Sequence, residues 1–145
     1  MTGAQPRVRF TSSLKAKLDA SSAQVAATIK AEFLQWKANP QVDHPFFGKD
    51  GFNRGSTKVR HVHLRPTIVK KEREWDVKFT DQRKRTSDRY LFYVDGGFSQ
   101  GYLLIDIIDD PGAHKIWDAA NKQVRLDYEA CAQRFIDLPL TKKVA

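Results

Sequence analysis

Cysteine and long apolar runs are both scarce in this chain of 145 residues, and each scarcity excludes a class of protein. The single cysteine, Cys131, excludes an intramolecular disulfide and a four-cysteine zinc site, and it favours a reducing compartment. The apolar runs are short, as in residues 102–105, which Asp106 ends, whereas a membrane helix needs about 20 apolar residues. The N-terminus lacks the apolar stretch of a secretory signal. We therefore expect a soluble, cytoplasmic protein that binds no membrane.

The motifs of several large enzyme classes are also missing. The sequence contains no glycine-rich phosphate loop, no nucleophile elbow and no zinc-protease motif. These absences leave phosphodiester chemistry carried by side chains alone, or binding without chemistry. We accordingly expect no cofactor.

Basic residues, by contrast, are abundant and concentrated. The chain has 25 Lys and Arg against 17 Asp and Glu, a formal net charge of +8. Thirteen basic and six acidic residues lie between Lys49 and Arg89, so this segment carries nearly all of the excess. Concentrated positive charge attracts polyanions, and phosphate contacts are the sequence-independent part of nucleic-acid affinity. A solvated surface, or a docking face for an acidic protein, would have the same composition.

The length of the chain and its pattern of apolar residues predict one α+β domain spanning residues 1–145. Alternation predicts strands at 7–11 and 58–65, and an edge strand or extended arm at 74–79. Aromatic and branched residues predict a strand at 90–95, and a nearly continuous apolar run predicts one at 102–108. Asp95-Gly96-Gly97 supplies the turn chemistry of a hairpin, and the Gly-rich stretch 45–55 is typical of a loop.

Two helices complete the expected fold. The first opens at Ser21 and ends at Asn39-Pro40, and the second runs from about 113 to 135. We expect two apolar stripes to pack these helices on a small, mostly antiparallel sheet. The stripes are Val25, Ile29, Phe33 and Trp36 in the first helix, and Ile116, Ala120, Val124, Tyr128, Cys131 and Phe135 in the second.

His61 and His63 are the first candidates for chemistry, because alternate residues of a strand point the same way, about 6.5–7 Å apart. The pair is compatible with three roles. It could chelate a metal, although zinc needs at least one more ligand and none is marked by spacing. Both histidines could be structural, or they could lie on a phosphate-facing surface and transfer a proton near neutral pH.

Two further segments are rich in cations. Residues 83–89 carry Arg83, Lys84, Arg85 and Arg89, which suit a phosphate grip or a solvated loop. His114 and Lys115 follow Pro111-Gly112 where a strand gives way to a helix, so free backbone N–H groups there favour anions. His114 is either a catalytic residue or an ordinary helix-end residue.

Several short motifs, in order, resemble the YafO toxins of bacterial type II toxin–antitoxin modules. They extend from about residue 45 to 135, and the N-terminal strand and helix fit the same outline. The motifs are Phe47-Gly48-Lys49-Asp50, residues 58–64, Arg85-Thr86-Ser87-Asp88, Leu91-Phe92-Tyr93, Gly96-Gly97-Phe98, residues 102–105, and Pro111 through His114-Lys115.

The resemblance implies a ribosome-dependent mRNA endonuclease of the RelE/ParE-like fold, held inactive by a cognate antitoxin. Its partners would be mRNA on the ribosome and the antitoxin, and its chemistry would be metal-independent RNA cleavage. By position we predict Arg85 as phosphate clamp, His114 as acid or base, Lys115 as charge stabiliser, His61 and His63 as further proton-transfer groups, and Asp88 as a residue that orients one of them.

For RNA contacts outside the catalytic set, we predict Arg60, Arg65, Arg83, Lys84 and Arg89. Two other classes of function share the same basic surface. A ParE-like toxin would poison a topoisomerase and would need no catalytic histidine, and a plain nucleic-acid-binding module would bind without turnover. We expect the antitoxin to lie across the basic surface or the sheet edge.

Overall fold

A computed structural model of the chain describes residues 6–77 and 85–138. A five-stranded sheet with the order β1-β5-β4-β3-β2 forms its centre. The strands are β1 (Val8–Phe10), β2 (Phe47–Phe52), β3 (Val59–Leu64), β4 (Tyr90–Asp95) and β5 (Tyr102–Ile108). All neighbouring pairs are antiparallel except β1 and β5, which are parallel. The predicted α+β class and mostly antiparallel sheet are confirmed.

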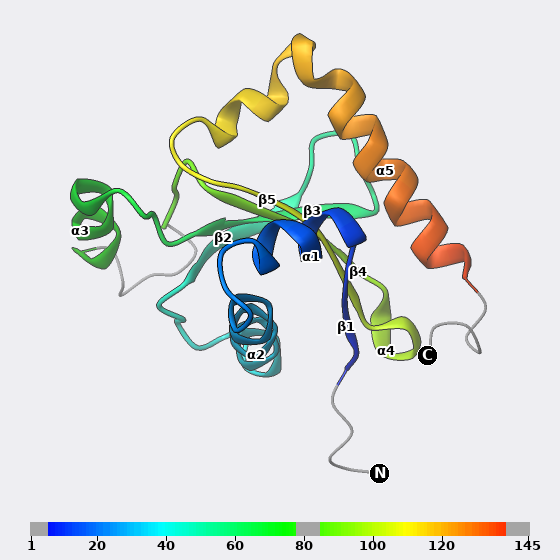
Figure 1. Cartoon of the computed structure of the whole chain (residues 1–145), viewed down its shortest axis with the longest axis horizontal. Helices are drawn as coiled ribbons and strands as arrows, with labels where there is room; N and C mark the ends of the chain where they lie inside the picture. Colours follow the sequence, from blue (N-terminus) through cyan, green and yellow to red (C-terminus); the bar gives the residue numbers. More distant parts are fainter. Residues whose placement is uncertain (1–5, 78–84, 139–145) are drawn as a thin grey trace.

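Helices cover the two faces of the sheet (Figure 1). On one face lie α1 (Ser12–Asp19) and α2 (Val25–Ala38), and on the other lies α5 (Lys122–Asp137). β4 and β5 are apolar almost throughout because they contribute to both layers. Leu91 and Leu104, for example, pack in the α2 layer, whereas Phe92 and Ile105 pack in the α5 layer.

The N-terminal helical region differs from the prediction in its boundaries. The sequence contains an additional helix, α1, which the side chain of Thr11 caps by accepting from the backbone N–H of Leu14 at 3.2 Å. α2 then begins at Val25, four residues later than predicted. In the predicted stripe, Phe33 and Trp36 are buried, while Val25 and Ile29 are half-buried and pack at the margin of the core.

Two segments between β1 and β4 have a different structure from the one predicted. Residues 47–52 form edge strand β2 in place of a loop, and Gly48 suits the crowded surroundings at its start. A Cβ atom on Gly48 would lie 2.6 Å from the Trp75 ring and 2.4 Å from the Arg85 carbonyl oxygen, so no larger residue fits. Residues 74–77 belong to helix α3 (Val69–Val77) and not to a strand, and the rest of 74–79 lies outside the described residues.

The reason for α3 lies in contacts that a short sequence window does not contain. The Asp110 carboxylate accepts from the backbone N–H groups of Thr67 and Ile68 just before the helix begins. Trp75, the buried side chain of α3, donates its indole N–H to the Pro45 carbonyl at 2.9 Å. One buried residue in a charged segment gives neither helical nor strand periodicity, so the alternation in 74–79 was misleading.

The connections after β4 and β5 are also more elaborate than predicted. β4 and β5 do form an antiparallel hairpin, but the one-turn helix α4 (Gly97–Gln100) links them. The predicted helix 113–135 is divided into the 3₁₀ turns η2 (Ala113–Trp117) and η3 (Ala119–Asn121), followed by α5. This division shifts the helical phase, so Val124 is exposed, contrary to prediction, whereas Ile116, Tyr128 and Phe135 are buried as predicted.

Within residues 6–77 and 85–138, every helix is too short or too polar to cross a bilayer.

Candidate functional site

The two histidines of β3 lie side by side in a pocket on the α5 side of the sheet. Their ring centroids are 5.8 Å apart, and the Tyr90 ring lies 5.2 Å from His61 and 4.9 Å from His63. The pocket has a volume of about 520 Å³. We call it the histidine pocket. Its lining residues are Lys49, Asp50, Gly51, Phe52, Arg54, His61, His63, Trp117 and Arg125.

The charge of the histidine pocket is positive. Lys49 and Arg54 are exposed, and within the described residues neither pairs with a carboxylate. The Arg125 guanidinium is fixed in place, because it donates to the carbonyls of Ile116 at 2.6 Å and Asp118 at 2.8 Å. Asp50 is the acidic residue of the lining, but its carboxylate already accepts from Arg60 and from the Tyr93 hydroxyl. Three cations therefore surround the two imidazoles.

His61 is held as a neutral imidazole with a defined tautomer. Its Nδ1 lies 2.8 Å from Oδ1 of the buried Asn53, an oxygen that only accepts hydrogen bonds. Nδ1 therefore carries the proton, and Nε2 has the free lone pair. Burial, with a smaller contribution from neighbouring His63, lowers the pKa of His61 to about 4. Near neutral pH this residue is ready to accept a proton.

His63 differs from His61 because its Nδ1 has a partner in both protonation states. Nδ1 lies 2.8 Å from the backbone N–H nitrogen of Ser87 and 2.8 Å from the carbonyl oxygen of the same residue. An unprotonated Nδ1 accepts from the amide, and a protonated Nδ1 donates to the carbonyl. Burial lowers the pKa of His63, while the hydrogen bond to the Ser87 carbonyl acts in the opposite direction. His63 is thus the better placed of the two to carry a positive charge.

A second cluster of polar residues, formed by Asp88 and His114, lies next to Ser87. Asp88 Oδ1 accepts from both the backbone N–H and Nδ1 of His114, each at 2.8 Å, and Oδ2 accepts from the backbone N–H of Gly112. Burial raises the pKa of Asp88, but the hydrogen bonds from His114 and Gly112 outweigh it and leave the pKa below its usual value. Asp88 therefore fixes the orientation of an exposed His114.

The two groups are linked through Ser87 and Asp88. His63 contacts the backbone of Ser87, and the next residue contacts His114. His114 and the exposed Lys115 do not line the histidine pocket, so these five predicted catalytic residues form two clusters, His61 with His63 and Asp88 with His114 and Lys115.

Arg85 belongs to neither cluster. Its side chain is fully buried, and the guanidinium donates to the carbonyls of His44 and Phe47 and lies over the Trp75 ring at 5.2 Å. A guanidinium with no exposed surface makes no phosphate contact in this conformation. Arg85 instead joins the start of β2 to α3, so we leave it out of the candidate site.

The basic residues predicted to contact RNA are also occupied elsewhere. Arg60 pairs with Asp50 at 3.0 Å on the α2 side of the sheet, Arg65 pairs with Glu72 and Asp76 of α3, and Arg89 pairs with Asp109 at 2.8 Å. Each of these guanidinium groups is already engaged by a carboxylate of the chain, so we omit the three residues from the proposed RNA contacts. Arg83 and Lys84 lie outside the described residues.

Of the residues that line the pocket, sequence reasoning singled out His61 and His63 alone. Lys49 and Arg54 belong to the basic segment, but they fall in the stretch 45–55, which the sequence predicts to be a loop. Trp117 and Arg125 lie more than 50 residues from the two histidines, and they reach the pocket only because η2 and α5 fold over β3. No spacing in the sequence marks that arrangement.

Comparison with known proteins assigns the chain to a family. The family model described as toxin YafO of type II toxin–antitoxin systems matches residues 34–137. This span contains β2 to α5, and with them both clusters. Searches of curated proteins and of solved structures found no match. Because the family model covers well over half of the chain, the protein belongs to the YafO toxin family of type II toxin–antitoxin systems.

Proposed function

We propose that this toxin is a ribosome-dependent mRNA endonuclease whose active site is the histidine pocket. The observation that carries the proposal is the pairing of two differently held imidazoles, His61 and His63, among three cations in one pocket. RNA cleavage needs a base, an acid and positive charge near the phosphate, and the pocket contains all three.

The geometry suggests how the two histidines divide the work. Nε2 of neutral His61 takes the proton of the ribose 2′-hydroxyl, whose oxygen then attacks the adjacent phosphorus. The bond from phosphorus to the 5′-oxygen breaks, and protonated His63 gives its Nε2 proton to that oxygen. The products are a 2′,3′-cyclic phosphate and a 5′-hydroxyl. The phosphate, being an anion, raises the pKa of both histidines when it binds, which favours the protonated state that His63 needs.

The remaining pocket residues bind and position the substrate in this mechanism. Lys49, Arg54 and Arg125 attract the phosphates and stabilise the additional charge that develops on the phosphate oxygens. The Trp117 ring is half-buried at 5.0 Å from the His61 ring, and it offers a stacking surface for an unpaired base.

The Asp88–His114 pair, with Lys115, is retained as a second proton-transfer group. Its histidine is exposed and oriented by a carboxylate, an arrangement that suits proton exchange with a bound RNA. Comparing the clusters by mutation separates a primary from an accessory role.

The test is cleavage of a reporter mRNA on translating ribosomes, with the new RNA ends mapped. We expect cuts at ribosome positions, and losses of about 10²–10⁴-fold for His61→Gln and His63→Gln, the usual range for an acid or a base. His114→Gln is the matched control from the other cluster, for which we expect a loss below tenfold. Thermal unfolding of each variant controls for folding.

Three results would contradict the proposal. Intact mRNA together with blocked DNA supercoiling would indicate a topoisomerase poison. Intact mRNA with RNA binding retained would indicate a binding module without turnover. A larger loss for His114→Gln than for both pocket variants would transfer the active site to the Asp88–His114 cluster.

A further inference from the structure

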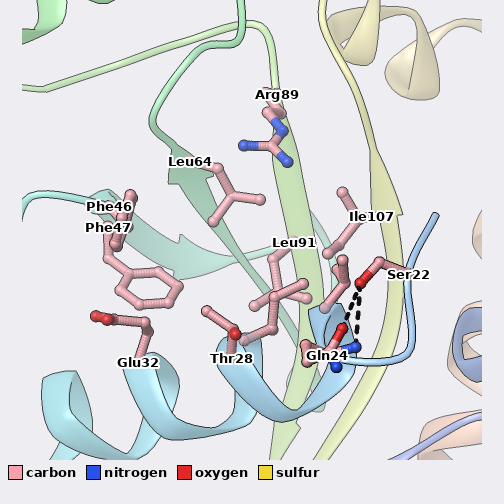
Figure 2. A pocket seen from close by; sticks show the side chains of 12 residues that line it. Ser22, Gln24, Thr28, Glu32, Phe46, Phe47, Leu64, Arg89, Leu91 and Ile107 are labelled. Carbon is pink, nitrogen blue, oxygen red and sulfur yellow. Dashed lines mark hydrogen bonds between the residues drawn. The ribbon is translucent and has the colours of Figure 1, made fainter. Parts of the chain in front are cut away.

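A second hollow lies on the opposite face of the sheet from the histidines. Figure 2 shows it between α2 and the sheet, with Leu64, Leu91 and Ile107 of three successive strands as its floor. Val25 and Ile29 of α2 form one wall, and Phe46, which is 42% exposed, stands at the other side. We call it the α2 groove.

The α2 groove is large and apolar enough to hold side chains of another molecule. Its volume is about 320 Å³, roughly twice that of a cavity of about 150 Å³ that accommodates benzene. Two side chains of Leu or Phe size would therefore fit. Covering an apolar hollow that is open to solvent is favourable, because it removes apolar surface from water, and such exposed sites mark contacts with partners.

Basic residues beside the α2 groove favour an acidic partner. Arg89 stands at one end of the groove (Figure 2), but it already pairs with Asp109 at 2.8 Å, so the cations next to the groove matter more. Another hollow, between α2 and edge strand β1, has Arg9, Lys15 and Lys30 as its basic residues, and no acid is in its lining. Lys15 also pairs with Asp19 at 2.8 Å, whereas Lys30 is exposed on α2. The acid in the lining of the α2 groove is Glu32, which lies at the α2 side and whose carboxylate is 3.0 Å from Nε2 of the buried His44.

The two hollows come closest just before α2, where Ser22 and Gln24 line the α2 groove and Ala23 lines the hollow beside β1, and from there they follow different sides of the helix. One extended partner segment could therefore contact both. An apolar floor offers RNA no hydrogen bonds to base edges, so a protein is the better occupant.

We propose that the α2 groove is the docking site of the antitoxin, which places apolar side chains in it and acidic residues against Arg9, Lys15 and Lys30. This proposal rests on membership of a type II toxin family and not on the proposed nuclease activity. The groove lies on the α2 face and the histidine pocket on the α5 face. Anchoring of the antitoxin and masking of the active site are then separate events.

The experiment measures binding of the full-length cognate antitoxin to the purified toxin, with no RNA present. Thr28 is exposed on α2 at the edge of the groove, so Thr28→Arg and Thr28→Asp place either charge there without disturbing the core. Both should weaken binding at least 30-fold, because either charge would be desolvated when an apolar side chain docks. Ala31→Arg and Ala31→Asp are matched controls on the same helix outside both hollows, and we expect changes below twofold.

A second measurement keeps the test independent of the variants. Hydrogen exchange of the unmodified toxin should slow in residues 22–32 and 44–47 when the antitoxin is added. Unchanged affinity in both Thr28 variants, or no protection of these residues, would overturn the proposal. Weaker binding for Thr28→Asp with tighter binding for Thr28→Arg would replace apolar docking by a purely electrostatic contact. None of these results depends on whether the toxin cleaves RNA.

Discussion

At the scale of single residues, the structure separates chemical groups that the sequence presents as equivalent. His61 and His63 are identical side chains two residues apart, yet one contacts a side-chain amide and the other a backbone amide and carbonyl. Likewise, Arg85 and Arg54 are both part of the basic segment, but the first is fully buried against carbonyl groups and the second is exposed in a pocket. Burial and partners, and not residue type, decide which groups are available for chemistry.

The histidines also predict how stability depends on pH. Burial lowers the pKa of His61 to about 4 and lowers that of His63, whereas both titrate near 6.5 in the unfolded chain. Between those values the unfolded chain binds more protons, so the free energy of unfolding falls as the pH is lowered from 6.5 towards 4. Above pH 7 both histidines are neutral in the folded and in the unfolded chain, so their contribution to the free energy of unfolding is constant. For His61 we expect a loss on the order of 3 kcal/mol by pH 4, since the pKa difference corresponds to about 1.4 kcal/mol per unit and the last part of the loss lies below pH 4.

Urea unfolding of the parent chain and of His61→Gln, at several pH values between 4 and 7.5, measures this contribution. The carboxylates titrate in both proteins and cancel in the comparison. The slope of stability against pH should be shallower in the variant, and equal slopes would mean that His61 is not protected from protonation in the folded chain.

At the scale of elements, sequence reasoning succeeded where the apolar pattern is dense. β3, β4 and β5 were placed within a residue, because their alternating or continuous apolar residues fill two core layers. It failed for β2 and α3, which depend on distant contacts such as Gly48 against Arg85 and Trp75 against Pro45. The histidine pair was identified from spacing alone, but the pocket around it depends on η2 and α5, which the sequence could not position.

Two residues of the apolar stripe of α2 test how far the sequence pattern alone indicates burial. Phe33 is fully buried and makes edge-on contacts with Trp36, Phe47 and Tyr93, so Phe33→Ala should cost about 3–5 kcal/mol. Ile29 belongs to the same apolar stripe but lies half-exposed in the α2 groove, so Ile29→Ala should cost about 1 kcal/mol or less. Denaturant unfolding of the two variants measures both costs. Equal costs would show that the α2 groove is closed in solution.

At the scale of the whole molecule, the sheet separates two surfaces of different character. The α5 face carries the histidine pocket with its three cations, and the α2 face carries an apolar groove of about 320 Å³. The net charge of +8 is therefore not evenly available, because Arg60, Arg65 and Arg89 are neutralised by acids of the fold. Location in the fold, and not the total charge, should determine which cations contribute to RNA binding.

This expectation can be measured as the salt dependence of binding to a short single-stranded RNA. Each phosphate contact on a single strand contributes about −0.7 to the slope of log K against log salt, so Lys49, Arg54 and Arg125 together predict a slope of about −2. Arg54→Ala should make the slope shallower by about 0.7. Lys30→Ala removes the same unit of charge from the α2 face, and it should leave the slope unchanged because that face does not contact the RNA. If the slope becomes shallower by the same amount in both variants, RNA binding responds to the net charge of the toxin, and the histidine pocket is not the RNA-binding site.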